Sequence, residues 1–153
     1  GIHARWVPSG SFRNSAGALP VTGSARRQDY SFAPTSRMRN TYIAAGTDDD
    51  EEMIATMGDG LYAKSMGGGS VNPATGEFNF SVREAYIVKD GKIDHPVRGA
   101  SLIGRGSELL TRIDRVGKNM RMAQGMCGSL SGSIPTNVGQ PMIRVSSITV
   151  GGC

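Results

Sequence analysis

The chain of 153 residues is long enough for one domain with a hydrophobic core, and two separate domains are not expected at this length. Its apolar content of 38% is ordinary, and no apolar run approaches the roughly 20 residues that a membrane-spanning helix needs. The formal charge of +4 comes from scattered basic residues, which favours a solvated face or an acidic partner over a nucleic-acid-binding patch.

The first 24 residues are rich in Gly, Ser, Pro and Ala and show neither a period nor the pattern of a signal peptide. Residues 1–24, with His3 exposed among them, are therefore interpreted as a flexible arm or a cloning remnant, and residues 25–153 as the folded domain. Two cysteines far apart in the sequence form no disulfide framework, so a cytoplasmic location is expected. The 22 glycines predict short strands and long connections.

A short strand is predicted over residues 40–46, and a short helix follows it. Asp48 or Asp49 can cap this helix, and the acidic residues 50–52 place negative charge at the positive end of its dipole. The acidic run could also bind a cation, but its position at a helix start favours capping. Gly58 is expected at the C′ position after the helix.

A glycine-rich loop, Gly67, Gly68 and Gly69, is predicted to follow a strand over residues 61–66. Its amides could bind an anion, but no Lys-Ser/Thr pair follows at the spacing of a phosphate-binding loop. We interpret the glycines as allowing another backbone to lie close or the loop to move. They are named as candidate substrate-binding residues.

A β-hairpin is predicted next, because residues 77–88 alternate in part between apolar and polar and end at the turn pair Asp90-Gly91. His95 is expected in the loop after this hairpin. A second helix is predicted over residues 106–117, with Ser107 as its cap.

The last part of the chain is predicted as two strand-like runs that flank a Gly/Ser/Pro loop. The first run ends at a turn over residues 125–128, and the second covers residues 142–150 with a bulge near Ser146 and Ser147. The sum is an α+β fold, predominantly antiparallel β-sheet, with two short helices and glycine-rich loops.

Cys127 stands out because glycines on both sides let another group approach closely. Its thiolate could be a metal ligand or a nucleophile, and these residues alone also allow an inert thiol. His95 could serve Cys127 as a general base in a cysteine peptidase, and the alternative is an ordinary loop histidine.

Several motifs in a fixed order resemble the C-terminal part of the TldD/PmbA family, with the TldD branch as the closer match. They are Arg26-Arg27, residues 37–41, 59–62 and 67–78, Gly125-Met126-Cys127-Gly128, Gly139-Gln140-Pro141 and residues 145–152. The resemblance covers roughly residues 22–152. The family is also called peptide-maturation proteins or modulators of DNA gyrase.

The resemblance implies a zinc metallopeptidase that cuts unfolded peptides as a heterodimer of TldD-like and TldE-like subunits. Zinc is held there by two histidines of an HExxxH helix, whose Glu is the general base, and by the cysteine of a GxC motif. Three protein ligands leave a position open for a water molecule whose pKa the metal lowers to about 7.

The chain departs from this pattern because it contains no HExxxH, and His3 and His95 are too far apart to replace it. It therefore resembles a C-terminal fragment that begins after the catalytic helix, and alone it is expected not to hydrolyse peptides. Two triplets fit GxC, Gly125-Met126-Cys127 and Gly151-Gly152-Cys153. In the family the ligand cysteine precedes the Gly-Gln-Pro motif, so the resemblance implies Cys127 rather than Cys153 as the zinc ligand.

The expected partners are a TldE/PmbA-like subunit or a second copy of the chain, together with an unfolded peptide substrate, and no membrane. An alternative of a different class is a non-catalytic module that binds peptides or assembles subunits through its β edges. A DNA-linked role, suggested by the basic charge and the older family name, is the weaker hypothesis.

Overall fold

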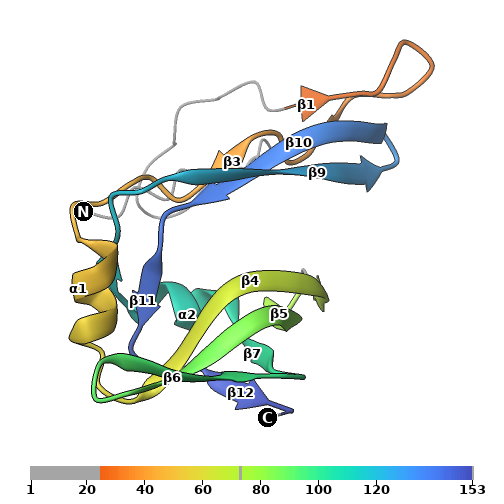
Figure 1. The fold of residues 1–153 in the computed structure, drawn as a ribbon. Coiled ribbons are helices and arrows are strands. Elements are labelled where there is room, and N and C mark those ends of the chain that lie inside the picture. Colours follow the sequence, from red (N-terminus) through yellow and green to blue (C-terminus); the bar gives the residue numbers. More distant parts are fainter. Residues whose placement is uncertain (1–24, 73, 153) are drawn as a thin grey trace, which may run out of the picture. The chain divides into compact units, whose positions relative to one another are not determined.

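The computed structural model describes residues 25–72 and 74–152, so the predicted arm 1–24 with His3, and also Cys153, lie outside the described residues. The described chain consists mostly of antiparallel strands with two short helices (Figure 1), which confirms the predicted α+β class. Contacts divide it into two compact units. The described residues of unit 1 are 25–45 and 120–141, and those of unit 2 are 46–72, 74–119 and 142–152.

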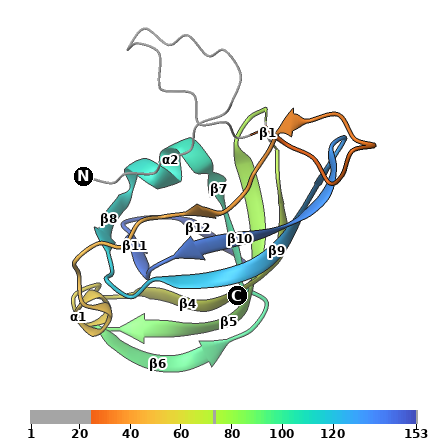
Figure 2. The same cartoon turned by 90° about the horizontal axis from the view of Figure 1, so that it is seen from above.

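Unit 2 contains a five-stranded antiparallel sheet. Four strands follow the order β12-β7-β5-β4, and β6 pairs with the last part of β5, beyond the part that pairs with β7. Figure 2 shows β4, β5 and β6 side by side. The strands are β4 (Gly60–Val71), β5 (Glu77–Lys89), β6 (Lys92–Val97), β7 (Ser101–Arg105) and β12 (Thr149–Gly151).

The predicted hairpin between β5 and β6 is confirmed. Asp90 and Gly91 both have positive φ, 48° and 72°, as a two-residue hairpin turn of the primed type requires. A side chain at Gly91 would overlap the backbone of Ala55, so only glycine fits this turn.

The core of unit 2 is built around buried apolar side chains of β5. Val82, Ala85 and Ala100 form one buried cluster, and half-buried apolar residues from β4, β6 and β7 pack against it. Irregular pairing between β4 and β5 shifts the buried side from Val82 to Ala85. The partial alternation of residues 77–88 is therefore interrupted between Val82 and Ala85.

The glycine-rich segment is part of strand β4 and is not a loop, which corrects the prediction. A Cβ atom at Gly67 would overlap Ser81, and one at Gly69 would overlap the backbone of Asn79 and Phe80. The glycines thus allow two strands to approach closely, as one of the two interpretations expected.

Helix α1 (Asp50–Ala55) begins as predicted, because the Asp49 carboxylate accepts hydrogen bonds from the amides of Glu51 and Glu52. The helix ends at Thr56, and Gly58 has φ 71° two residues after this C-cap rather than at C′. Each helix has six residues, and neither helix in the described part is long and apolar enough to span a membrane.

The second predicted helix is wrong in its second half. Helix α2 (Gly106–Thr111) has no side-chain cap at its N-terminus, and Ile113–Val116 form strand β8, which pairs with β11 (Ile143–Val145). Pairing and the burial of Ile113 override the helical spacing of the apolar residues. The predicted strand 142–150 is accordingly two strands, β11 and β12, interrupted at residues 146–148 near the predicted bulge.

Unit 1 contains a three-stranded sheet in the order β3-β10-β9 and a small ladder of β1 with β2. β9 and β10 are antiparallel, whereas the short β3 runs parallel to β10. The strands are β1 (Ala25–Arg26), β2 (Thr35–Ser36), β3 (Thr41–Tyr42), β9 (Arg121–Ser129) and β10 (Gly132–Gln140).

Two predictions for this region are corrected. Residues 125–128 lie inside β9 and are not a turn, and the predicted Gly/Ser/Pro loop contains strand β10. The chain turns instead at residues 130–131, next to Gly132 with φ 83°. Pro135 is tolerated in β10 because β3 pairs only with Val138 and Gly139, so this proline needs no N–H on that side.

Candidate metal ligand and its surroundings

Cys127 lies near the end of β9, where it pairs with Ile134 of β10. Its side chain is half-buried, and the thiol is free. A Cβ at Gly125 would meet only ordinary contacts with Thr136, so this glycine is not required by a turn. The thiol is therefore presented from a regular strand, which gives it a defined direction and partial access.

Arg37 contacts the sulfur directly. Its Nη2 atom lies 3.6 Å from Cys127 Sγ and donates a hydrogen bond of 3.0 Å to the carbonyl oxygen of Gly128. One exposed guanidinium thus bridges the sulfur and the backbone of the next residue.

Arg26 holds the same residue from its backbone. It is only 8% exposed, and it donates from Nε to the carbonyl of Met38 at 2.8 Å and from Nη2 to the carbonyl of Cys127 at 2.9 Å. Its third nitrogen, Nη1, is buried and has no hydrogen-bond partner. Sequence reasoning missed both arginines as site residues, although Arg26 and Arg37 stand in the motifs that carried the family resemblance.

The described residues fit a metal only in part. A cysteine sulfur is a good zinc ligand, and a half-buried sulfur on a strand can occupy one corner of a tetrahedral site. Residues 25–72 and 74–152 contain no group of three or more His, Cys, Asp or Glu side chains that could hold a metal ion. This part of the chain can therefore supply one donor, and a complete site needs donors from elsewhere.

His95 lies in strand β6 rather than in the predicted loop, and its side chain is 56% exposed. Its Nδ1 atom lies 2.9 Å from the carboxylate of Asp94, which also pairs with Lys89 at 3.0 Å. The hydrogen bonds from Lys89 and then His95 lower the pKa of Asp94 below its usual value. These exposed contacts indicate a surface histidine, and its pairing with Cys127 stays a hypothesis.

The candidate substrate-binding glycines lie in β4, which is an edge strand of its sheet among the described residues. Gly68 is the open position of the three, because a Cβ there would meet nothing within 4 Å. Its carbonyl oxygen accepts a hydrogen bond of 2.8 Å from the Ser81 hydroxyl. The role of Gly67, Gly68 and Gly69 in substrate binding stays a prediction.

A shallow groove lies on the sheet of unit 1. It is lined by Asn40, Gln124, Gly125, Met126, Pro135, Thr136 and Asn137. The Asn40 side chain accepts a hydrogen bond of 3.1 Å from the amide of Asn137, which fixes one wall. The groove combines amide groups with apolar surface, a combination that suits a peptide chain.

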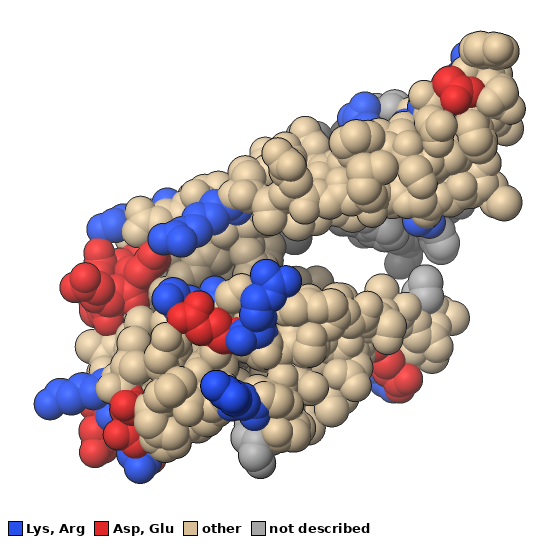
Figure 3. Space-filling view, turned by 45° about the vertical axis from the view of Figure 1, so that its right-hand side comes forward, with Lys and Arg blue, Asp and Glu red and all other residues tan. Residues whose placement is uncertain are grey.

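The charged side chains of the described residues are mixed in sign on the face that Figure 3 shows. On the face shown in Figure 3, Lys and Arg side chains are dispersed and acidic side chains lie among them. Unit 2 contains several exposed ion pairs, such as Lys64–Glu84 at 2.7 Å and Lys118–Asp49 at 2.7 Å. This distribution agrees with the scattered basic residues of the sequence.

Comparisons with known proteins agree with the family resemblance. Residues 13–152 match the family model described as the PmbA/TldA metallopeptidase C-terminal domain. A metalloprotease TldD homolog of Haemophilus influenzae is 43% identical over 136 residues, which are 88% of this chain and 28% of the relative. A zinc metalloprotease TldD homolog of Saccharolobus solfataricus is 32% identical over 133 residues, covering 87% of this chain and 30% of the relative.

Solved structures share the fold. TldE from Thermococcus kodakarensis matches with a TM-score of 0.67 at 21% identity, over 86% of this chain and 28% of that protein. A putative modulator of DNA gyrase from Thermotoga maritima matches with a TM-score of 0.59 at 23% identity, over 73% of this chain and 24% of that protein. The chain thus spans less than a third of the length of these relatives, and it belongs to the PmbA/TldD family as its C-terminal domain.

Proposed function

We propose that this chain is the C-terminal domain of a zinc metallopeptidase that cleaves unfolded peptides, and that Cys127 is one of the zinc ligands. The observation that carries the proposal is a half-exposed thiol, fixed on a strand, in a chain whose relatives include a protein named zinc metalloprotease. The two histidines and the general-base glutamate of an HExxxH helix would come from polypeptide outside these residues.

The chain's own contribution is to hold a sulfur donor in place. Pairing of β9 with β10 and the hydrogen bond from Arg26 fix the backbone of Cys127, and the contact with Arg37 restricts its side chain. Zinc bound by three protein ligands supplies an activated water for peptide hydrolysis. Because a single thiol cannot hold zinc tightly, the chain alone is expected to bind zinc weakly and not to cleave peptides.

Metal analysis of the full-length protein tests the ligand role. Cys127→Ala is expected to lose zinc and peptidase activity, whereas Cys153→Ala, the matched control, keeps both. Thermal unfolding of the zinc-free proteins shows whether either substitution disturbs the fold. Unchanged zinc content in Cys127→Ala refutes the proposal.

We further propose a cytoplasmic protein that pairs with a TldE/PmbA-like subunit or with a second copy of itself. The fold shared with TldE supports this partner class. Sedimentation of the full-length protein alone, and mixed with a TldE-like protein, distinguishes the two assemblies. A strict monomer in both experiments contradicts both.

A second candidate function is a non-catalytic module that binds peptides or assembles subunits. Two observations favour it. Among the described residues β4 and β9 are edge strands of their sheets, and a groove lined in part by amide side chains lies on unit 1. An extended peptide could add a strand to such an edge. Titration of the chain with a fluorescent unfolded peptide tests this, and the absence of binding by a strictly monomeric chain refutes it.

A further inference from the structure

We propose that Arg26 and Arg37 are positioning residues that fix Cys127 for metal binding, Arg37 through the sulfur and Arg26 through the backbone of the same residue. This inference rests on the proposed ligand role of Cys127. It assigns a function to two side chains that come from a segment distant in sequence and that meet at one cysteine.

Arg37 connects the sulfur of Cys127 to the backbone of strand β9. Its Nη2 atom contacts both Cys127 Sγ at 3.6 Å and the carbonyl oxygen of Gly128 at 3.0 Å. The hydrogen bond to the backbone thus holds the guanidinium in place beside the sulfur. A charged donor makes a stronger hydrogen bond than a neutral one. Outer partners of this kind orient metal ligands in proteins.

Arg26 has features that packing alone does not explain. A buried guanidinium is costly without a carboxylate partner, and two of its three nitrogens contact only backbone carbonyls while Nη1 contacts no acceptor. The guanidinium lies beside Cys127, because Nη2 donates to the carbonyl oxygen of this residue at 2.9 Å. A negative charge on a metal-bound sulfur of the same residue would offset part of this cost. The unpaired Nη1 and the absence of a carboxylate partner among the described residues together are the reason that we infer an anionic group near Arg26.

The two arginines share a second feature. Neither Arg26 nor Arg37 has a carboxylate partner within the described ranges, where the arginine ion pairs involve Arg105, Arg112, Arg115 and Arg144 instead. Two cations without an acidic partner thus converge on one cysteine, which is the arrangement expected around an anionic ligand rather than an inert thiol.

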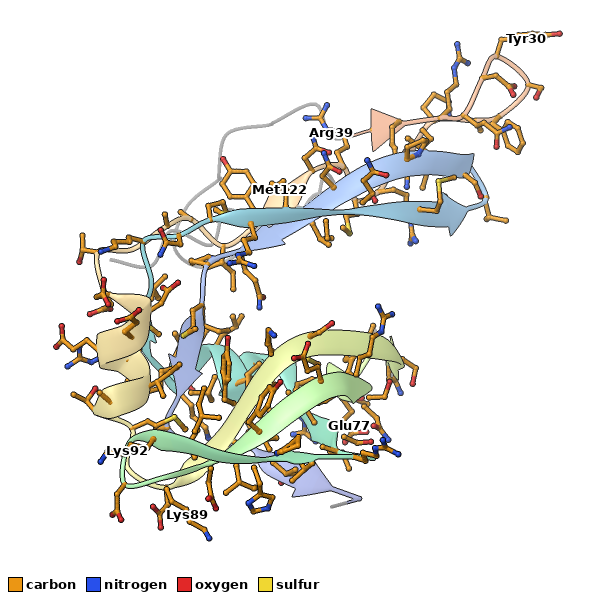
Figure 4. All side chains as sticks on the ribbon, in the orientation of Figure 1. Tyr30, Arg39, Glu77, Lys89, Lys92 and Met122 are labelled. Atoms are coloured by element: carbon orange, nitrogen blue, oxygen red, sulfur yellow. The ribbon has the colours of Figure 1, made fainter. Side chains whose placement is uncertain are left out.

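Metal binding by full-length variants tests the inference, with Arg39→Met as the matched control for Arg37→Met. Arg39, labelled in Figure 4, is exposed and has no hydrogen bond or ion pair with the described residues. The measurements are the zinc dissociation constant, by competition with a chromophoric chelator, and the sulfur-to-cobalt absorption band of the cobalt-substituted protein. The band reports the geometry at the sulfur, which a general loss of stability does not shift.

Arg37→Met is expected to weaken zinc binding roughly 10- to 100-fold and to shift the cobalt band, while Arg39→Met changes neither. Arg37→Lys is expected to recover part of the lost affinity. Arg37 is exposed, so its variants fold even if substitution of the buried Arg26 disturbs the fold.

Two results overturn the inference and are distinguishable. Unchanged affinity and an unchanged band in Arg37→Met, with both lost in Cys127→Ala, reject the positioning role and leave the ligand role intact. Unchanged zinc binding in Cys127→Ala rejects the ligand role and the positioning role together.

Discussion

Alanine substitutions at Gly68 and Gly69, made one at a time, separate substrate binding from packing in the glycine-rich part of β4. A Cβ at Gly69 would overlap the Asn79 carbonyl and the Phe80 Cα atom, which are backbone atoms and cannot move without distorting β5. A Cβ at Gly68 would meet nothing within 4 Å, and its φ lies in the ordinary range. These neighbouring glycines thus differ in the space around them but not in chemistry.

The expected stabilities differ in sign. Overpacking costs about 1–3 kcal/mol, so Gly69→Ala should lower the free energy of unfolding by that amount. Gly68→Ala should leave it unchanged or raise it by about 0.4–1 kcal/mol, because alanine restricts the unfolded chain without strain in the folded one. Urea denaturation of the chain measures both values.

The functional assay is cleavage of an unfolded peptide by the full-length protein carrying each substitution. If the glycines bind substrate, Gly68→Ala lowers the cleavage rate although its stability is intact. Full cleavage by this variant removes Gly68 from the substrate-binding candidates. A Gly69→Ala protein as stable as the parent refutes the packing argument itself.

Two further predictions concern stability. Met53 is 2% exposed, so Met53→Ala should lower the free energy of unfolding by about 2–5 kcal/mol, and Met66→Ala, at a side chain 41% exposed, by much less; equal losses in urea denaturation contradict this. The hydrogen bonds from Arg144 lower the pKa of Asp114 below its usual 3.8, so this carboxylate stabilises the fold above that pH and loses its effect as the pH falls through the lowered pKa. Asp114→Asn should therefore lower the unfolding free energy slightly at neutral pH, since the pair is partly exposed, and not in strong acid; the same loss at both pH values refutes the ion-pair explanation.

Signals carried by adjacent residues predicted the fold best. Asp49 caps α1 through amides two and three residues later, and Asp90-Gly91 fixes a turn through its own backbone angles. Neither feature depends on a distant partner. For this reason the start of the first helix and the β5–β6 hairpin could be predicted from the sequence.

Signals that depend on a distant partner failed. The apolar spacing around Ile113 fits a helix, but a strand some thirty residues later pairs with this segment and the Arg144–Asp114 bridge ties the two together. Likewise, glycines at residues 125 and 128 permit a turn without requiring one, and the neighbouring β10 extends them into a strand. A local sequence pattern does not show which distant strand will pair with a segment, and this pairing decides between helix, turn and strand.

The same difference between local and distant signals applies to the candidate site. A resemblance of motifs singled out Cys127, but the arginines beside it come from 90 and 101 residues away and carry no spacing that links them to the cysteine. A thiol in a mobile turn could adjust to a metal wherever its other ligands lie. On a strand the backbone is fixed and only the side chain can rotate, so contacts that restrict this rotation decide the direction of the thiol. The location of Cys127 in β9 rather than in a turn therefore explains the two arginine contacts. Arg26 and the pairing of β9 hold the backbone of Cys127, and Arg37 contacts the sulfur itself and restricts its direction.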